Sequence, residues 1–355
     1  MKRPVLFAPV SGPGGSGEYY RCLALARALA ERDGRPVHFL LHEAARVERD
    51  ERFHYHLLAA SPTRATVEVI AIVDRIRPAL AVFDAAGRMA QYDAVRRVGG
   101  KLAWVSNRPK KRRKGFRPRM LRRLDLHLVA SPEQAASGMG GWERFKWRYC
   151  GQPRVRFFST IAPAVNADAA QRSCRDHGLN PGEYVLFVGG GGGHFHAGRP
   201  VPEWLLEAAR RLQAETGRQC VVVMGPQYRG ELRTDAEVKV IERLDSPVLA
   251  QLLSRARLAV SGAGWMMSSQ LLATGVPAVF VPAGGADQPE RIRRYADAGL
   301  AESAPLEPRA IAEAARRLDA DDSRRKALVQ RIEEHGIRND TAVLAGELLD
   351  LIEDS

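Results

Sequence analysis

The chain has 355 residues, of which 45% are hydrophobic and 27% are charged, and its formal net charge is +13. These values fit a soluble globular protein that is long enough for two domains with separate cores. The apolar run at residues 5–10 is too short and strand-like for a secretion signal or a membrane span. The four cysteines are scattered and form no metal-type pair. We therefore expect a cytoplasmic protein with reduced thiols.

The first predicted elements are a strand at residues 5–10, a glycine-rich turn at residues 11–17 and a helix at residues 20–31. Such a turn lets a ligand approach the backbone closely. A dinucleotide fingerprint is a rival interpretation, because the G-x-G-x-x-G/A spacing is loosely met and the strand at residues 37–41 runs into His42-Glu43. The turn residues that we mark as a candidate acceptor loop are Gly14, Gly15, Ser16 and Gly17.

The first half continues to alternate strands and helices, with a helix at residues 67–76 and strands at residues 80–84, 102–106 and 126–130. Asp84 ends one of these strands, and active-site groups gather at the carboxyl ends of parallel strands. The same position suits a helix N-cap, so both roles stay open for Asp84.

Residues 108–123 carry ten Lys or Arg and no acid, and they supply ten of the thirteen net positive charges. Concentrated basicity indicates a site for an anionic partner. Phe116, Met120 and Leu121 lie within the run, and we expect them to add apolar contacts to a bilayer surface. Nucleic acid and a merely solvated face are the alternatives, although no nucleic-acid reading motif is present. The residues that we assign to the anionic surface are Lys110, Lys111, Arg112, Arg113 and Lys114.

An aromatic cluster follows at Trp142, Phe145, Trp147 and Tyr149. Core packing is the favoured interpretation, and a second membrane contact is the alternative. Residues 154–170 have no clear period, so we place the crossover to a second domain there.

The second half opens with a strand at residues 184–188 and five consecutive glycines at residues 189–193. Because glycines lose much conformational entropy on folding, close approach of the backbone to a ligand explains this loop best, and it marks Gly190, Gly191 and Gly192. His194 and His196 follow, but His-x-His alone is too little for a metal site. Further helices are expected at residues 202–215 and 246–255, with strands at residues 220–224 and 238–241.

Residues 261–299 organise the chain. A buried strand at residues 258–261 turns through glycines into a helix at residues 265–273, and a second buried strand at residues 278–281 is followed by a loop and another helix. Strand–helix–strand units place ligands at the carboxyl ends of their strands. The N–H groups at the start of the first helix, at Trp265, Met266 and Met267, favour an anion such as a diphosphate. Helices at residues 308–318, 323–335 and 341–352 complete the chain.

This stretch resembles the donor-binding half of GT-B glycosyltransferases, especially the family 28 group that includes the enzyme making lipid II. The family pattern G-(small)-x-x-x-x-E-x-x-x-x-G-x-P, followed by a strand and an acidic-Gln pair, is matched at Gly264, Gly275, Pro277, Asp287 and Gln288. Gln270 stands where the family has a ribose-binding Glu, and it offers a carbonyl oxygen without the charge.

The N-terminal turn is similar to the G-x-G-H-x-x-R-x-(L/A)-x-(L/I)-A signature of predicted GT-B transferases and of a nucleotide-sugar hydrolase in nonulosonate biosynthesis. Gly15, Gly17, Arg21, Leu23 and Ala26 match it. The signature His, a candidate base in those relatives, falls on Glu18. A carboxylate can accept a proton, so Glu18 is either the base or an acid that stabilises the first helical turn.

The resemblance implies an α/β protein of the GT-B class, with two Rossmann-like doubly wound domains facing each other across a cleft. We place the domains at residues 1–162 and 163–355, with a last helix that can cross back to the first. The implied reaction is transfer of a sugar from a nucleotide-diphosphate sugar, expected to be UDP-linked, to an acceptor hydroxyl with inversion. Glu18 is the preferred base over Asp84. Helix N-termini would hold the diphosphate, so neither a metal nor another cofactor is expected.

Relatives that act on lipid-linked acceptors dock on the membrane. The basic run therefore favours a peripheral location on the cytoplasmic face of the membrane and a lipid-linked or anionic acceptor, with no specific nucleic acid. Two alternatives remain. A nucleotide-sugar hydrolase would use water as acceptor, and a non-catalytic nucleotide-sugar-binding protein would explain the departures at Glu18 and Gln270.

Overall fold

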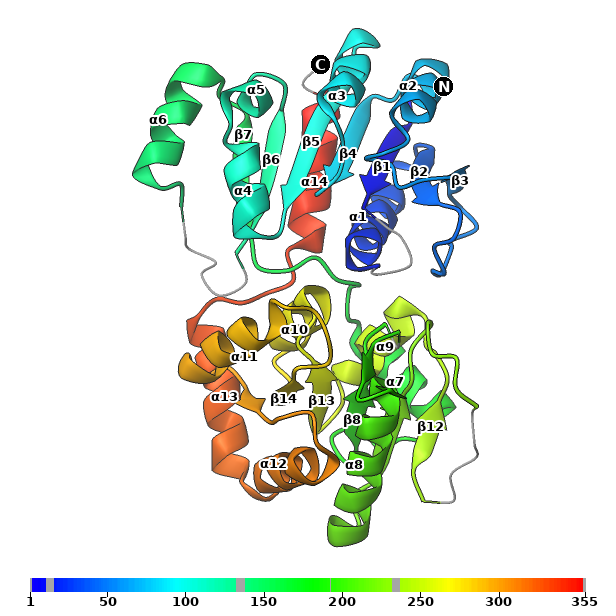
Figure 1. Ribbon diagram of the computed structural model, residues 1–355, viewed down its shortest axis with the longest axis vertical. Coiled ribbons are helices and arrows are strands. Elements are labelled where there is room, and N and C mark those ends of the chain that lie inside the picture. Colours follow the sequence, from blue (N-terminus) through cyan, green and yellow to red (C-terminus); the bar gives the residue numbers. More distant parts are fainter. Residues whose placement is uncertain (1, 11–15, 132–137, 192, 232–236, 354–355) are drawn as a thin grey trace. The chain divides into compact units, whose positions relative to one another are not determined.

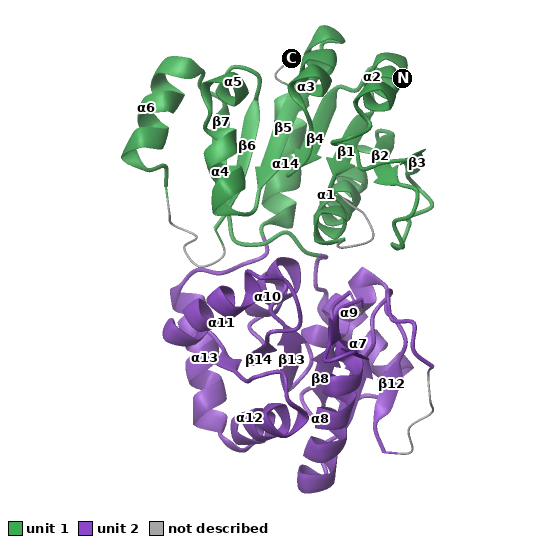
Figure 2. Cartoon of the chain, in the orientation of Figure 1, with its two compact units in different colours: residues 1–162, 340–355 green, residues 163–339 purple. Residues whose placement is uncertain are grey.

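Strands and helices alternate along the chain, and the computed structural model describes residues 2–10, 16–131, 138–191, 193–231 and 237–353. The chain divides into two units (Figure 2). Unit 1 contains residues 1–162 and 340–355, and unit 2 contains residues 163–339. The C-terminal helix is therefore a part of unit 1.

Unit 1 is built on a seven-stranded sheet in the order β3-β2-β1-β4-β5-β6-β7, and every neighbouring pair is parallel (Figure 1). Its strands are β1 (Val5–Pro9), β2 (Val37–His42), β3 (His54–Leu58), β4 (Leu80–Asp84), β5 (Lys101–Ser106), β6 (Leu126–Ala130) and β7 (Arg154–Phe158). Its helices are α1 (Gly17–Asp33), α2 (Thr66–Ile76), α3 (Met89–Arg97), α4 (Pro109–Gly115), α5 (Pro118–Leu121), α6 (Gly141–Cys150) and α14 (Thr341–Glu353).

The strand order of unit 1 reverses at β1, which pairs with β2 on one side and β4 on the other. Helices α2 and α3 pack together, and α1 packs with α14. Alternate strand residues such as Leu6 and Phe83 form one core with α2 and α3. The central strands are therefore mostly apolar, as expected of strands buried on both faces. Ligands of such sheets bind beyond the carboxyl ends of the strands at the reversal.

Unit 2 has a six-stranded parallel sheet in the order β12-β11-β8-β13-β14-β15, and a small antiparallel pair β9-β10. Its strands are β8 (Val185–Val188), β9 (Phe195–His196), β10 (Arg199–Pro200), β11 (Cys220–Val223), β12 (Lys239–Ile241), β13 (Leu258–Gly262), β14 (Ala278–Val281) and β15 (Glu302–Ser303). Its helices are α7 (Ala167–Asp176), α8 (Val201–Thr216), α9 (Ser246–Leu253), α10 (Trp265–Ala273), α11 (Gln288–Asp297), α12 (Pro308–Ala320) and α13 (Asp322–Glu334).

Two cores sandwich the unit 2 sheet. Val185 and Phe187 of β8 face the core that α8 and α12 cover, whereas Leu186 and Val188 face the core that α10 and α11 cover. This alternation explains the continuous apolar runs of β8, β11, β13 and β14, because both faces of these strands are buried.

The expected strands and most helices are present within a few residues of the predicted bounds. The crossover to the second unit lies within residues 154–170 as expected, because unit 1 ends at Ala162 and unit 2 begins at Pro163. The irregular structure expected across this range is wrong in part, because residues 154–158 form strand β7, paired with β6, and α7 begins at Ala167. Strand β3 and helices α3 and α6 were not predicted. Within the ranges that the structure describes, no helix combines the length and apolarity needed to cross a bilayer.

Candidate active site

Three loops of unit 2 carry the predicted donor residues. Strands β8, β13 and β14 are neighbours in a parallel sheet, so the loops that follow them lie at one edge. The first loop holds Gly190 and Gly191, the second leads through Gly264 into α10, and the third ends at Asp287. Segments about a hundred residues apart in sequence are thereby brought together. Gly192 lies outside the described residues.

The glycine-rich loop is packed tightly against its own unit. A Cβ at Gly189 would lie 2.7 Å from a side-chain carbon of Pro202, and one at Gly193 would lie 2.4 Å from the side-chain oxygen of Gln227. A Cβ at Gly284, in the third loop, would lie 2.6 Å from the His194 ring, so the first and third loops touch. Part of the glycine content thus serves packing of the loops against each other and against their unit.

No side chain caps the N-terminus of α10. Its N-cap residue is Gly264, and its first turn contains no acidic residue. A Cβ at Gly264 would meet no atom within 4 Å, and Trp265, Met266 and Met267 are partly buried. A helix of this length presents partial positive charge at its N-terminus, which attracts anions.

The predicted donor residues Gln270, Asp287 and Gln288 differ in the hydrogen bonds that their side chains make. The side chain of Gln270 is 5% exposed and forms no hydrogen bond with the described part of the chain. Gln288 accepts the Ala283 N–H through Oε1 at 3.0 Å, so that oxygen shapes the third loop. Asp287 is half-exposed and accepts a hydrogen bond from the buried Arg291, which also donates to the carbonyl of Ala263.

His194 and His196 follow the glycine loop. His194 packs against the third loop, and the His196 ring lies edge-on to Trp204 at 5.2 Å. Counting the described residues alone, no group of three or more His, Cys, Asp or Glu is placed to hold a metal.

A second polar cluster lies in unit 1, at the reversal of strand order. Asp84, at the end of β4, is 1% exposed and accepts two hydrogen bonds of 2.8 Å from the guanidinium of Arg21. Burial raises the pKa of Asp84 to about 6, and the charge of Arg21 opposes that rise. Asp84 and Arg21 therefore hold α1 on the end of β4, a role that the sequence did not show.

Glu18, in the first turn of α1, is more accessible. Its side chain is 18% exposed and lies 4.0 Å from the Arg21 guanidinium. Asn107, directly after β5, donates a hydrogen bond to Glu18 Oε1 at 3.2 Å. Asn107 is itself buried, and its Oδ1 has no hydrogen-bond partner among the described residues. Ser16 is the N-cap of α1 but makes no side-chain cap. The loop residues Gly14 and Gly15 lie outside the described part, and Gly17 begins the helix.

Lys111 joins this cluster. Its Nζ donates to the carbonyl of Ala85 at 2.7 Å, where the backbone has an unusual positive φ of 52°. Burial lowers the pKa of Lys111, and Glu18 and Asp84 act in the opposite direction. Asn107 was not predicted, and Lys111 was predicted only as a surface charge. Asn107 could have been predicted only from its position directly after an apolar strand, where the site residues of parallel sheets gather.

The basic run forms α4 and α5, and only some of its cations are exposed to solvent. Lys110 and Arg113 are exposed, whereas Arg112 pairs with both carboxylate oxygens of Glu143 at 2.9 and 2.7 Å. Lys114 is partly buried and lies over the Trp104 ring at 5.5 Å.

The expectation that Phe116, Met120 and Leu121 contact a membrane is wrong, because each is at most 1% exposed. These side chains hold α4 and α5 to the sheet. The favoured core role of the aromatic cluster is also wrong in part. Trp147 packs against a small core, but Trp142 and Tyr149 are each 69% exposed.

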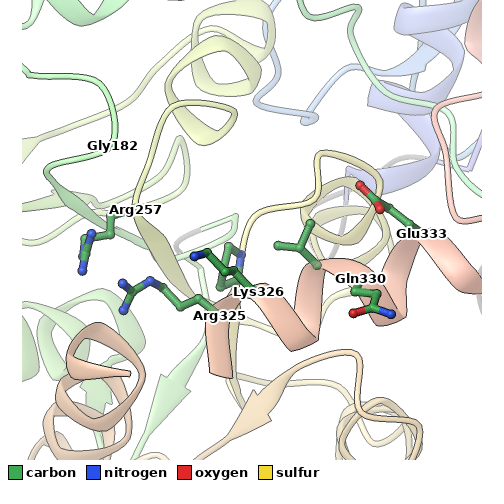
Figure 3. A pocket seen from close by; sticks show the side chains of 8 residues that line it. Gly182, Arg257, Arg325, Lys326, Gln330 and Glu333 are labelled. Carbon is green, nitrogen blue, oxygen red and sulfur yellow. The ribbon is translucent and has the colours of Figure 1, made fainter. Parts of the chain in front are cut away.

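A cavity of about 520 Å³ lies at the opposite edge of the unit 2 sheet, where β13 and β14 begin (Figure 3). Arg257, Arg325 and Lys326 line it, but these cations already pair with Asp319 and Asp322 of the same unit. The cavity is therefore separate from the three donor-type loops.

No protein-family model matches the sequence, and no curated protein matches it. Solved structures do match over nearly the whole length. The spinosyn forosaminyltransferase SpnP has a TM-score of 0.65 and 14% identity, with 99% of this chain and 100% of that chain covered. The calicheamicin glycosyltransferase CalG4 has a TM-score of 0.63 and 18% identity, with 99% of each chain covered.

Phytolacca americana UGT2, solved with UDP-2-fluoro-glucose and pterostilbene, has a TM-score of 0.65 and 15% identity, with 99% of this chain and 100% of that chain covered. Identities this low carry information on fold alone. Together with the two parallel sheets described above, the full-length matches establish that this chain has the GT-B fold, with two Rossmann-like units.

Proposed function

We propose that this protein is a glycosyltransferase that moves a sugar from a nucleotide-diphosphate sugar, expected to be a UDP-sugar, to an acceptor hydroxyl. The observation that carries the proposal is the combination of a full-length GT-B fold with three donor-type loops at one edge of the unit 2 sheet. Solved neighbours include complexes with UDP-2-fluoro-glucose and with dTDP, and a ligand of this class suits the loops of unit 2.

In this proposal the N-terminus of α10 binds the diphosphate. No side chain caps the start of α10, so the N–H groups of Met266 and Met267 in its first turn would donate to the diphosphate, and the helix dipole favours its charge. Gln270 has a free amide and binds the ribose hydroxyls, where the family 28 pattern has a carboxylate. The neighbouring loops provide Gly190, Gly191 and the exposed carboxylate of Asp287.

Glu18 is the proposed general base, and Asp84 is the less favoured one because Arg21 occupies both of its oxygens. The base takes the proton of the acceptor hydroxyl while the acceptor oxygen attacks the anomeric carbon. The bond from that carbon to the diphosphate oxygen breaks, and the diphosphate leaves with the electron pair. A single displacement of this kind inverts the anomeric centre. Asn107 acts as a positioning residue because it donates to Glu18.

The acceptor is proposed to be lipid-linked or anionic and to be reached at a membrane surface. Support comes from the exposed cations of α4, such as Lys110 and Arg113, in a run that contains no acid. Lys111, Arg112 and Lys114 are partly buried, which reduces the number of charges available for this purpose.

A thermal-shift screen with UDP-, GDP-, dTDP- and CMP-sugars tests the donor assignment. A ligand at one hundred times its Kd stabilises the folded state by about 2.7 kcal/mol, so one nucleotide class should raise the Tm clearly. Gln270→Ala should reduce that shift, and Gln270→Glu, which restores the family carboxylate, should preserve or increase it. If no nucleotide sugar raises the Tm, the donor site and the proposed activity both fail.

Turnover separates the remaining alternatives. A transferase releases nucleoside diphosphate only when an acceptor is supplied, whereas a hydrolase releases it in water alone. A binding protein shows the thermal shift and no release under either condition. Acceptor-dependent release is the result that the proposal requires.

A further inference from the structure

Helix α6 displays an aromatic surface that the proposed chemistry does not use. None of its residues is buried. Trp142 is 69% exposed, Phe145 is 52% exposed and Tyr149 is 69% exposed. Large aromatic side chains are costly to leave in water, so three of them on a single exposed helix indicate a binding surface.

These three residues form one stripe. They occupy positions i, i+3 and i+7, which fall within about 60° of each other around the helix axis. The rings contact one another, with centroids 5.2 Å apart for Trp142 and Phe145 and 4.9 Å apart for Phe145 and Tyr149. The other side of α6 is anchored, because Trp147 donates to the carbonyl of Pro153 at 2.9 Å.

The charges around the stripe are of one sign. The single acid of α6 is Glu143, and both of its oxygens accept hydrogen bonds from Arg112 of α4. This ion pair links α6 to α4 and neutralises the negative charge of Glu143. Lys146 flanks the stripe with its Nζ 5.9 Å from the centre of the Trp142 ring, and Arg148 is exposed on the other flank. Figure 1 shows α6 and α4 near β6 and β7, at the edge of the unit 1 sheet that these two strands form.

We propose that the aromatic stripe (Trp142, Phe145 and Tyr149) inserts at the headgroup level of an anionic lipid bilayer, while exposed cations of α6 and α4 contact the lipid charges. An apolar aromatic face bordered by Lys and Arg is the composition of interfacial helices. The inference extends the membrane acceptor of the proposed function and rests on it in that respect. The inference assigns the apolar membrane contact to the aromatic stripe, because Phe116 and its neighbours are buried.

Two other occupants fit less well. A second copy across a twofold axis would place this same cationic face opposite itself, and like charges would repel. Single-stranded nucleic acid needs open ring faces for base stacking, but Trp142 and Phe145 are stacked on each other with their planes 4° apart.

Vesicle co-sedimentation tests the proposal. The probe is a vesicle of about three parts phosphatidylcholine to one part phosphatidylglycerol, with pure phosphatidylcholine for comparison. The variant Trp142→Ser/Phe145→Ser/Tyr149→Ser should bind the anionic vesicle roughly tenfold or more weakly than the wild type, because the inserted apolar area is lost. The matched control is Phe195→Ser, which removes an aromatic side chain of unit 2 that is 67% exposed, and it should bind like the wild type.

Salt and fluorescence give independent readouts. Lys110→Gln/Arg113→Gln should remove part of the salt-sensitive binding, and the stripe variant should remove the part that persists at high salt. Trp142 emission should shift to shorter wavelength on anionic vesicles, and Trp142→Phe should abolish that shift while it preserves binding. Wild-type affinity in the stripe variant would overturn the proposal, as would stripe-dependent dimerisation or stripe-dependent retention of single-stranded RNA without vesicle binding.

Donor binding distinguishes this inference from the proposed function. The thermal shift with nucleotide sugars is measured without vesicles, and the three stripe residues lie in unit 1, whereas the donor loops lie in unit 2. If the donor shift is normal and vesicles are ignored, the docking inference alone fails. If vesicles bind and no donor shift occurs, the proposed function fails and the docking surface stands.

Discussion

The sequence left Asp84 open to two roles, an active-site group or a helix N-cap, and the structure shows a third, a buried ion pair with Arg21. Asp84 is fully enclosed, and Arg21 contacts both carboxylate oxygens with ideal hydrogen-bond lengths. A run of apolar residues ending in Asp predicts the end of a strand, but it does not predict that the Asp pairs with a residue 63 positions earlier in the chain. Such contacts between residues distant in sequence could not be predicted from single residues.

The buried pair predicts a large loss of stability for Asp84→Asn. That change leaves the Arg21 charge without its partner in the interior, which typically costs about 3–5 kcal/mol. Removing both charges, in Asp84→Asn/Arg21→Met, should cost less than Asp84→Asn alone. Urea denaturation followed by circular dichroism measures both. A loss below about 1 kcal/mol in the single variant would show that the pair contributes little to folding.

Glu18→Gln tests the proposed base. The substitution preserves shape and removes the proton acceptor, so turnover should fall by roughly 10²–10⁴ while donor affinity stays the same. Glu43→Gln is the control, because Glu43 is an exposed acid of the same unit. Near-normal turnover in Glu18→Gln would return Glu18 to a role in stabilising the first turn of α1.

At the scale of elements, the buried strands were predicted well because strands enclosed on both faces read as short apolar runs. The edge strands β3 and β7 were missed for the same physical reason. Half of their side chains face solvent, so HYHLL and RVRFF carry histidines and arginines that interrupt the apolar pattern. Helix α6 was missed because its apolar residues face outward, a pattern that a search for a core-facing stripe misinterprets.

The N-terminus of α10 gives an element-scale prediction. Gly264 has φ −58°, and a Cβ at this position would lie in open space, so side chains fit there without strain. Gly264→Asp should cap the helix and raise stability by a few tenths of a kcal/mol, but donor binding should weaken at least about tenfold because the carboxylate competes with and repels the diphosphate. Calorimetry with UDP measures the loss. Gly264→Asn is the control, since it caps without charge and should weaken UDP binding less. Equal UDP affinity in all three proteins would remove α10 from the donor site.

At the scale of the whole molecule, the motifs in the sequence pointed to the donor-type loops of unit 2 and to the polar cluster of unit 1. The glycine turn with Arg21 and the stretch at residues 261–299 led to the loops at the carboxyl ends of both sheets. Asn107 could not be found in this way, because no motif surrounds it and its contact with Glu18 is made by the fold. The basic run was predicted as one surface, yet packing divides it into paired, partly buried and exposed cations, since successive residues of a helix point to different faces.

Three histidines in unit 1 have lowered pKa values. Burial lowers the pKa of His127 to about 3, and Glu143 acts against the decrease while Arg112 adds to it. Burial also lowers the pKa of His38 to about 4, with further decreases from His56, His54 and Arg75. The pKa of His56 is lowered by burial first and by Arg75 and His54 after it.

These shifts predict that unit 1 loses stability on mild acidification. A histidine in the unfolded chain has a pKa near 6.5, so between about pH 6.5 and 4 the unfolded state binds protons that the folded state refuses. The stability present at pH 7 is therefore lost as pH falls, and His127 alone accounts for about 2 kcal/mol at pH 5. Asp84 acts oppositely over part of this range, because its raised pKa lets the folded state hold one proton, but three histidines outweigh it.

Hydrogen exchange at pH 7 and pH 5 measures this prediction separately in each unit. Amides of β1, β4 and β5 should lose protection at pH 5 by more than those of β8 and β13. His127→Gln removes the titrating ring and retains a side chain that can bond to Ser106, the present partner of His127 at 3.0 Å. The variant should be less stable at pH 7, since its cavity is imperfectly filled, but its further loss between pH 7 and 5 should be smaller by about 2 kcal/mol. An equal loss in both proteins would mean that acid sensitivity arises elsewhere, with the His38 and His56 pair as the next residues to replace.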